Sequence, residues 1–445
     1  MASASTSKRI VIVGAAGRDF HNFNCLYRDD STVRVVAFTA AQIPNIDGRT
    51  YPAALAGRHY PEGIPIVPEE ALEQTIRETN ADVALFSYSD VSYGHVMGIS
   101  ARANAAGAAF ELAAPVHTML PSKKPVIAIC AVRTGCGKSQ TTRLVAQTLK
   151  EMGKRVAVIR HPMPYGDLAK QACQRYAELA DMDRHECTIE EREEYELHIE
   201  SGNLLFAGVD YHQILKAAEE EADVILWDGG NNDTAFFEPD LLITVADPHR
   251  AGHELAYYPG ELNFRMADVI LINKVRTAKP EAVELVAANA ARVNPSAQVI
   301  RGESRVTLDN VDQVRGRRVL VVEDGPTLTH GGMTFGAGHV AAKQAGAGSI
   351  VDPRPFAVGS IRETFAKYNH LTDILPAMGY GQTQMGELEQ SINASDCDVV
   401  VIGTPIDLSK LLKINKPTAR VRYELAGDGA DRLTAIVKGH PSLEG

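Results

Sequence analysis

The residues best placed for chemistry form the segment 131–139, Ala-Val-Arg-Thr-Gly-Cys-Gly-Lys-Ser. An apolar run precedes this segment, and Gln140 begins a pattern typical of a helix. Small residues let successive backbone N–H groups turn around phosphate oxygens, and the start of a helix adds partial positive charge. Lys138 is expected to reach the terminal phosphates of a nucleotide, and the Ser139 hydroxyl to bind Mg²⁺. The expected nucleotide contacts are Thr134, Gly135, Cys136, Gly137, Lys138, Ser139 and Gln140; an ordinary strand-to-helix turn is the alternative.

The loop departs from the standard consensus G-x-x-x-x-G-K-S/T, because Val132 stands where that consensus has its first glycine. It fits better the variant K-G-G-x-G-K-S/T, with Arg133 in place of the additional signature lysine and Thr134 in place of a glycine. Enzymes with the variant loop that this segment resembles couple nucleotide hydrolysis to a ligation, a transfer or a conformational change. Arg133 is therefore a candidate catalytic residue, and one hypothesis has it act across a dimer interface.

Carboxylates that follow apolar strands are the candidate metal ligands. Asp228 follows the apolar run 224–227 and begins the segment Asp-Gly-Gly-Asn-Asn-Asp, so it is placed to hold the Mg²⁺ shell or to orient a nucleophile. Asp233 is the second choice for this role. The loop after the strand 156–160 offers Asp167 as a further metal ligand and His161 as a phosphate contact. Turn or helix-cap aspartates and a structural loop are the alternatives.

Asn273 and Lys274 stand at the end of the apolar strand 269–272, where nucleotide-binding folds read the base. GTPases have N-K-x-D at this point, and the aspartate accepts hydrogen bonds from guanine. Arg276 occupies the aspartate position in this chain. The sequence therefore favours ATP over GTP, with Asn273 and Lys274 packed against the purine or, alternatively, a simple polar strand end.

Basic side chains near glycine-rich segments are the candidate contacts for an anionic substrate. The segment 323–338 is rich in glycine and contains His330, and Arg354 and Arg362 follow it. Glycines allow a ligand to approach the backbone closely, and arginine suits phosphate by charge and geometry. Arg18 and His21 follow the first strand of the chain, where an incomplete G-x-G-x-x-G gives weak support for dinucleotide binding. A flexible surface loop and purely structural side chains are the alternatives.

Composition limits the class of protein. The chain has 445 residues, enough for two or three domains, and a net charge of −11 argues against a general nucleic-acid or membrane-surface binder. The sequence predicts no membrane span and no signal peptide at Met1, so a cytoplasmic location is expected. Six scattered cysteines form no zinc spacing and are typical of free thiols.

The apolar runs predict an α/β fold in three regions. Residues 1–123 alternate strands with helical patterns, as in a Rossmann-like domain. Residues 124–325 are expected to form a P-loop NTPase domain around a parallel sheet. Residues 326–445 are expected to complete that second sheet. The acidic segment 181–200 is interpreted as a solvated helical insertion.

Taken together, these segments resemble the cyclic 2,3-diphosphoglycerate synthetase family. The resemblance is carried by residues 14–24, by the segment 124–143 with its loop, by Asp-Gly-Gly-Asn-Asn-Asp at 228–233 and by residues 323–338. It runs from about residue 8 to the C-terminal strand. The loop paired with the 228–233 segment is far more specific than a phosphate loop alone.

The resemblance implies ATP- and Mg²⁺-dependent closure of an intramolecular phosphoanhydride in 2,3-bisphosphoglycerate, with release of ADP and phosphate. Such chemistry rests on positioning and charge neutralisation. A potassium ion is a further candidate cofactor, and a homodimer is the expected assembly. The implied catalytic residues are Lys138, Asp228, Arg133 and His330, and the implied substrate contacts are Arg18, His21, His161 and Arg354.

Two other functions compete with this interpretation. The first is a nucleotide-driven switch or metallochaperone of the same P-loop class, which acts on a protein partner and for which clustered metal-binding cysteines or histidines are expected. The second is a protein that senses phosphorylated metabolites through its N-terminal domain without catalysis. A related enzyme could also keep the ATP-binding residues and act on a different acid.

Overall fold

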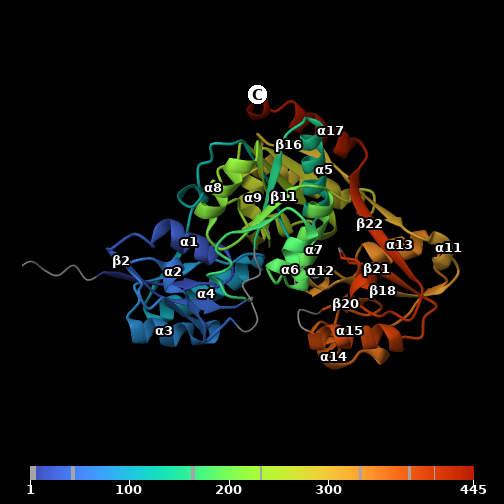
Figure 1. Ribbon diagram of the computed structural model, residues 1–445, viewed down its shortest axis with the longest axis horizontal. Coiled ribbons are helices and arrows are strands. Elements are labelled where there is room, and N and C mark those ends of the chain that lie inside the picture. The colour runs from blue at the N-terminus through green and yellow to red at the C-terminus, as the bar shows by residue number, and fades with distance from the viewer. Residues whose placement is uncertain are drawn as a thin grey trace, which may run out of the picture.

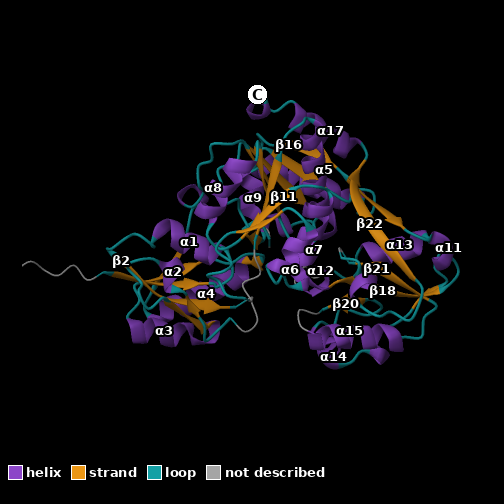
Figure 2. Cartoon of the chain, viewed as in Figure 1, coloured by secondary structure: helices purple, strands orange, loops and turns teal. Residues whose placement is uncertain are grey.

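The computed structural model describes residues 7–41, 46–161, 166–230, 233–329, 333–378, 382–404 and 406–444. The described strands form three main sheets, each covered by helices, and the fold is mixed α/β with parallel sheets, as predicted. Figure 1 shows the first unit in blue, the second above the centre in green and yellow, and the third in orange and red. Helices surround the strands of each unit in Figure 2.

The first sheet is built from short apolar runs near the N-terminus. Its order is β3 (Thr50–Tyr51), β4 (Ile64–Pro68), β2 (Val33–Ala40), β1 (Lys8–Val13), β5 (Val83–Phe86) and β7 (Ala109–Leu112). Its helices are α1 (Arg18–Leu26), α2 (Ala53–Ala56), η1 (Glu69–Ala71), α3 (Leu72–Thr79), α4 (Tyr93–Ala106) and η2 (Pro115–His117). Among the described pairs of this sheet, β3 with β4 is antiparallel and the others are parallel. The order reverses between β1 and β5, and such a reversal opens a crevice at the carboxyl ends of the strands.

The second sheet carries the phosphate-loop strand near its centre. Its order is β10 (Gln174–Tyr176), β11 (Leu204–Ala207), β9 (Val156–Arg160), β12 (Val224–Trp227), β8 (Val126–Ala131), β13 (Leu241–Ala246), β15 (Val269–Ile272) and β16 (Gln298–Arg301). Alternate residues of β8 enter different cores, Ile127 and Ile129 on one face and Ala128 and Cys130 on the other. Burial on both faces explains why these strands are continuous apolar runs.

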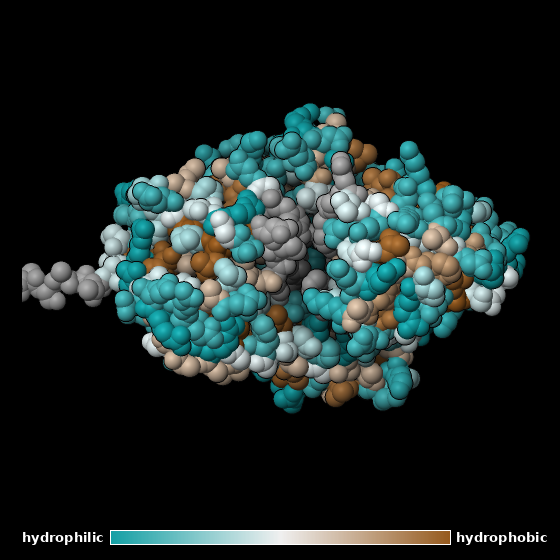
Figure 3. Space-filling model, turned by 90° about the horizontal axis from the view of Figure 1, so that it is seen from below, coloured by the Kyte–Doolittle hydropathy of each residue, from teal (hydrophilic) through white to brown (hydrophobic). Residues whose placement is uncertain are grey.

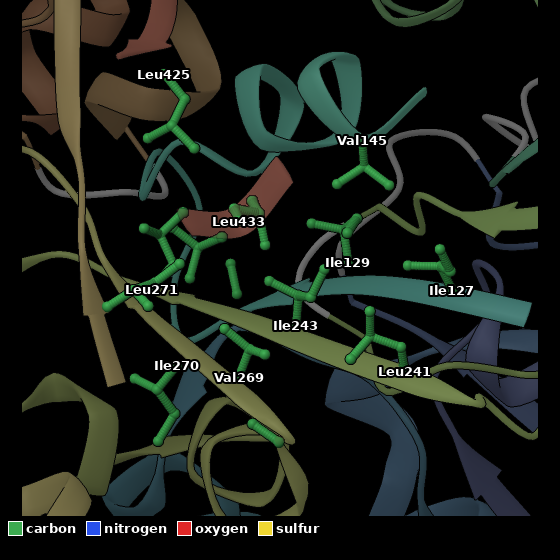
Figure 4. Packing of buried hydrophobic residues seen from close by; sticks show 14 of the residues in the cluster. Ile127, Ile129, Val145, Leu241, Ile243, Val269, Ile270, Leu271, Leu425 and Leu433 are labelled. Atoms are coloured by element: carbon green, nitrogen blue, oxygen red, sulfur yellow. The ribbon is translucent and has the colours of Figure 1, made fainter. Parts of the chain in front are cut away.

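Helices cover both faces of the second sheet. They are α5 (Lys138–Glu151), α6 (Leu179–Arg184), α7 (Ile189–Glu200), α8 (Tyr211–Glu221), η3 (Pro248–Arg250), η4 (His253–Leu255), α9 (Gly260–Met266) and α10 (Pro280–Val293). Figure 4 shows Val145 of α5 and Leu433 near Ile129, Ile243 and Leu271 in one apolar cluster. A short ladder of β6 (Val91–Ser92) with β14 (Tyr257–Tyr258) joins the first unit to the second.

The third unit has a sheet of its own. Its order is β17 (Glu303–Leu308), β22 (Thr418–Ala426), β21 (Val399–Gly403), β18 (Arg318–Asp324) and β19 (Ser349–Ile350), and β20 (Leu375–Ala377) also pairs with β18. Its helices are α11 (Val311–Val314), α12 (Gly325–Thr329), α13 (Ala337–Gln344), η5 (Arg354–Phe356), α14 (Gly359–Lys367), α15 (Gln382–Ala394), α16 (Leu408–Leu411), α17 (Asp428–Lys438) and η6 (Pro441–Leu443).

This arrangement differs from the expectation that residues 326–445 complete the second sheet. Their strands pair instead with β17 and β18, which lie before residue 326. Helix α17 nevertheless packs on the second unit, where Leu433 and Val437 join its apolar core. An apolar run specifies burial, but it does not specify which neighbouring strand supplies the hydrogen bonds.

The surface is mainly hydrophilic on the face drawn in Figure 3, with apolar residues scattered among polar ones. None of the described helices combines the length and the apolar character needed to cross a lipid bilayer.

Candidate active site

The phosphate loop lies between β8 and α5, as the sequence predicts. Gly135 and Gly137 adopt φ angles of 81° and 107°, a left-handed conformation that favours glycine. A side chain at Gly137 would also place its Cβ 2.1 Å from Nδ2 of Asn273. The loop therefore needs glycine at this position for two independent reasons, its backbone angles and the closeness of Asn273.

Asn273 and Lys274 support the loop from the end of β15. The Asn273 amide donates to the Cys136 carbonyl at 3.0 Å, and the Lys274 ammonium group donates to the Gly135 carbonyl at 2.6 Å. Asp247, which follows β13, binds Lys274 at 2.8 Å. The structure thus gives these two residues a role that sequence reasoning missed, namely fixing the shape of the loop. Contact with the purine stays a prediction.

Lys138 and Asp228 meet at the carboxyl ends of adjacent parallel strands. Their side chains form an ion pair, and the Thr142 hydroxyl donates to the same carboxylate oxygen at 3.0 Å. The other oxygen of Asp228 lies 2.9 Å from Arg160 and 3.2 Å from Nε2 of His198. We call Lys138, Thr142, Arg160, His198 and Asp228 the nucleotide cluster.

Electrostatics in the nucleotide cluster keep Asp228 ionised. Burial alone would raise the pKa of Asp228, but Arg160 and Lys138 hold that pKa well below its usual value. Burial lowers the pKa of Lys138, and Asp228 opposes this effect. An ionised carboxylate beside a lysine ammonium and an arginine suits a site where phosphate charge must be balanced.

Helix α7 supplies part of the nucleotide cluster, which corrects the interpretation of residues 181–200 as a solvated insertion. Thr188 and Glu191 form a capping box that starts this helix. Glu194 makes an ion pair with Arg160, His198 binds Asp228, and the Tyr195 hydroxyl donates to the His161 carbonyl at 2.9 Å. The acidic composition concealed a helix with one buried face that contacts the site.

Arg133 is tied to the first unit instead of extending from the loop. Its Nε lies 2.5 Å from Oδ1 of Asp90, and its guanidinium carbon lies 3.7 Å from the centre of the Tyr257 ring. The Thr134 backbone N–H also donates to Asp90, at 3.3 Å. Both charged side chains are 5% exposed. The structure therefore gives Arg133 a partner within its own chain, and an action across a dimer interface stays a hypothesis.

A second buried ion pair joins the first unit to the segment after β12. Arg18, at the start of α1, lies 2.7 Å from Oδ1 of Asp233 and also contacts the Thr234 hydroxyl. Burial raises the pKa of Asp233, although Arg18 and Ser89 oppose the rise. His161 directly follows Arg160, the last residue of β9. The Nε2 atom of His161 lies 3.6 Å from Oδ2 of Asp233. The structure thus brings Arg18 and His161 together at Asp233, and their contact with a substrate stays a prediction.

Other residues that were predicted as substrate or metal contacts lie away from Asp233 or are enclosed between the packed units. His21 is fully buried, with Nε2 at 2.6 Å from the Thr118 carbonyl and its ring stacked on Phe236, so it packs between units instead of lining an open site. Burial lowers the pKa of His21 to about 3. This position differs from the expectation of a substrate contact, because the imidazole is already bonded and enclosed.

Asp167 and Arg354 are exposed and have local partners. Asp167 accepts the Ala169 N–H at 2.9 Å, as a turn aspartate does, and no described contact joins it to Asp228. Arg354 in η5 pairs with Asp352 at 2.7 Å in the third unit, and the described contacts do not connect it to the phosphate loop. The predicted metal role of Asp167 and substrate role of Arg354 thus gain no support from their positions.

Three further predicted residues complete the comparison with the sequence. Ser139 follows Lys138 on α5 and is exposed, and Gln140 is buried and accepts a hydrogen bond from Ser304 at 3.2 Å. His330 lies outside the described residues. Among the described residues, no group of three or more histidine, cysteine, aspartate or glutamate side chains has the arrangement of a metal site.

Sequence reasoning missed several residues that shape the site. They are Asp90, Thr142, Arg160, Glu194, His198 and Asp247. The position of Thr142 could have been predicted, because Thr142 stands four residues after Lys138 and therefore lies on the same face of α5. Arg160 and Asp247 each stand at a strand end beside the loop, a position that attracts functional side chains in parallel sheets.

Comparison with known proteins gives one extensive match. No family model matches the sequence. The chain is 60% identical over 431 residues to the arginine synthetase ArcE of Thermococcus kodakarensis, which covers 97% of this chain and 96% of that protein. A match of this extent includes all three units.

Solved structures give weak overall matches. Hydrogenase maturation factor HypB from Archaeoglobus fulgidus is 18% identical with a TM-score of 0.26, over 40% of this chain and 81% of that one. Cobyrinic acid a,c-diamide synthase from Mycobacterium smegmatis, with bound ATP analogue and magnesium, is 15% identical with a TM-score of 0.19, over 40% and 71%. Scores this low carry no argument about the present chain.

Proposed function

The chain belongs to the family of the arginine synthetase ArcE, and we propose that it is itself an ATP-dependent synthetase that completes the guanidino group of arginine. Identity of 60% along 97% of the chain supports the transfer of the reaction class. The phosphate loop and the nucleotide cluster supply the residues that an ATP-driven step requires.

General chemistry points to citrulline as the acceptor. Its ureido carbon carries two nitrogens and one oxygen, and the guanidino carbon of arginine carries three nitrogens. The ureido oxygen would attack the γ-phosphorus of ATP, and the bond from that phosphorus to ADP would break. Ammonia would then attack the ureido carbon, the carbon–oxygen bond would break, and phosphate would leave with one proton from the added nitrogen. The sum is citrulline, ATP and ammonia giving arginine, ADP and phosphate.

The observation that carries this proposal is that basic side chains expected to meet the substrate are paired with carboxylates. Three arginines predicted to contact or act on an anionic substrate already have carboxylate partners: Arg18 with Asp233, Arg133 with Asp90, and Arg354 with Asp352. A neutral ureido group fits such a balanced environment. 2,3-Bisphosphoglycerate carries several negative charges and would need a surplus of cations.

The chain's own residues can act as follows. When ATP binds, the Lys138 ammonium group would move from Asp228 to the terminal phosphates, as phosphate-loop lysines do. Asp228 would remain ionised, because Arg160 and Lys138 hold its pKa well below its usual value. Arg160, fixed by Glu194, would balance charge on the transferred phosphoryl group.

Oxygen ligands suit Mg²⁺, and the Ser139 hydroxyl and the Asp228 carboxylate are of this kind. Mg²⁺ held by these residues would supply charge neutralisation for the nucleotide phosphates. Ser139 follows the phosphate-loop lysine and is exposed at the start of α5, so its side chain is accessible. These two residues are the proposed ligands from the chain.

Closure of a phosphoanhydride in 2,3-bisphosphoglycerate is the second candidate, favoured by the pairing of the loop with the 228–233 segment. ADP release from ATP and Mg²⁺ separates the candidates when citrulline with ammonium, or 2,3-bisphosphoglycerate, is added. Stimulation by citrulline with ammonium supports the arginine reaction, and stimulation by 2,3-bisphosphoglycerate supports ring closure. Hydrolysis indifferent to either would contradict both and favour a nucleotide-driven switch.

A further inference from the structure

Three polar aromatic side chains pack together beside Asp233. The His161 ring centre lies 5.4 Å from that of Trp227 and 5.9 Å from that of Tyr211, and the Tyr211 and Trp227 rings lie 5.7 Å apart. Tyr211 begins α8, Trp227 ends β12 and His161 follows β9. We call His161, Tyr211, Trp227 and Asp233 the aromatic pocket.

Polar atoms of the aromatic pocket lack hydrogen-bond partners. His161 is 7% exposed and Tyr211 and Trp227 are fully buried. Within the described structure, Nε2 of His161, the Tyr211 hydroxyl and Nε1 of Trp227 have no hydrogen-bond partner. Buried polar groups are almost always satisfied, so the three orphaned atoms are the groups that a small polar molecule bound beside these rings would satisfy.

The aromatic pocket adjoins the nucleotide cluster at two places in the chain, where His161 follows Arg160 and where Asp233 follows Asp228 by five residues. His161 follows Arg160, which binds Asp228, and Nε2 of His161 lies 3.6 Å from Asp233. Asp228 and Asp233 belong to one short segment, so a molecule in the pocket would lie near the residues that are proposed to bind phosphate. Asp233 also contributes to the raised pKa of the Tyr211 hydroxyl, for which burial is the main cause.

We propose that the aromatic pocket binds the nitrogen donor of the reaction, as ammonium or ammonia. This inference rests on the proposed function. Ammonia has three N–H donors and one lone pair, and the pocket offers acceptors at the Asp233 carboxylate, the Tyr211 oxygen and an imidazole nitrogen, with aromatic faces that favour ammonium. Nε2 of His161 has no hydrogen-bond partner within the described structure, so it is available to accept an N–H.

The pocket would deliver ammonia to the activated ureido carbon. Ammonium that enters would transfer a proton to the Asp233 carboxylate, whose Oδ2 lies 3.6 Å from Nε2 of His161. The neutral ammonia would then form the new carbon–nitrogen bond as the carbon–oxygen bond to phosphate breaks. Enclosure by Trp227 and Tyr211 would keep water from attacking in its place.

The test is the KM for ammonium in Tyr211→Phe, which removes one acceptor and keeps the ring. We expect this KM to rise about tenfold, the effect of one hydrogen bond, with the KM for ATP and for citrulline unchanged. Tyr176→Phe is the matched control, because Tyr176 is also a fully buried tyrosine of the second unit but donates to Gln174 at 3.0 Å. An unchanged KM for ammonium in Tyr211→Phe would overturn the inference.

A binding measurement keeps the inference testable if citrulline proves not to be the acceptor. Absence of any citrulline-dependent turnover in the natural chain would reject the proposed function alone. Thermal unfolding in ammonium chloride is then compared with sodium chloride at equal concentration. Stabilisation by ammonium in the natural chain and in Tyr176→Phe, and its loss in Tyr211→Phe, supports the pocket. Equal effects of the two salts on the natural chain would reject it.

Discussion

Arg133 of the phosphate loop and Asp90 of the first unit form a buried ion pair, with Nε and Oδ1 2.5 Å apart. Asp90 adopts a φ angle of 62°, a left-handed conformation that aspartate tolerates better than most residues. The adjacent β6–β14 ladder brings Tyr257 against the guanidinium group. The first unit thereby fixes the position of the nucleotide loop.

Substitution of one partner in this pair is expected to be strongly destabilising. Asp90→Ala or Arg133→Ala leaves the other charge buried and should lower the free energy of unfolding by about 3–5 kcal/mol. The double variant should lose less than the sum of the two single losses. Urea unfolding of the four proteins measures the coupling, and strict additivity would show that the two side chains do not interact.

Gly137→Ala should abolish nucleotide binding. A Cβ at this position would stand 2.1 Å from Asn273 on a backbone with φ of 107°, so the loop must distort. Gly153→Ala is the matched control, because Gly153 has φ of 78° but nothing within 4 Å of its Cβ. The control should lose about 1 kcal/mol of stability and keep its affinity for ATP in calorimetric titration. Equal affinities in the two variants would contradict the assignment of the loop.

His198→Ala should lower kcat by about ten- to a hundredfold, the usual range for losing a hydrogen bond to a charged group. His198 binds Asp228 at 3.2 Å from helix α7, and the bond helps to orient this carboxylate. His198→Gln retains an N–H donor and should recover part of the rate. His212→Ala, on the exposed side of α8, serves as the control. Full activity of His198→Ala would remove α7 from the proposed site.

Glu323→Gln should remove a pH-dependent loss of stability. Burial raises the pKa of Glu323 from 4.5 to about 7. Because the pKa is higher in the folded protein, the stabilising contribution is complete below pH 4.5 and is lost as pH rises towards 7, by about 3 kcal/mol. Unfolding at pH 5 and pH 8 should show this difference between the natural chain and Glu323→Gln. The exposed Glu363→Gln should behave like the natural chain, and a parallel pH dependence in all three would contradict the expectation.

The sequence was sufficient to predict the pair Lys138 and Asp228. Each residue follows an apolar run that reads as a parallel strand, and β8 and β12 prove to be neighbours in the sheet. Since carboxyl ends of parallel strands meet at one edge, local patterns were enough to place the two side chains together. The same reasoning placed Asn273 and Lys274 at a strand end where nucleotide-binding folds read the base, but their bonds to loop carbonyls depend on atomic geometry and were not predicted.

Contacts between distant segments could not be predicted in this way. Nothing local distinguishes Glu194 or His198 from other residues of an acidic helix, because their roles arise only when α7 packs beside β11 and these side chains reach Arg160 and Asp228. Asp90 likewise becomes important through Arg133, 43 positions away in the chain. The strand 318–324 was expected in the second sheet, but its partners lie in the third. Tertiary packing decides each of these outcomes.

The most direct test of the proposed reaction follows the ureido oxygen of citrulline. Citrulline labelled with ¹⁸O at this atom is incubated with ATP, Mg²⁺, ¹⁵N-ammonium and the protein, and phosphate is analysed by ³¹P NMR. The account predicts one ¹⁸O atom in the released phosphate and one ¹⁵N atom in the guanidino group of arginine, in equal amounts. Phosphate that contains no ¹⁸O, or ADP release without arginine, would contradict it.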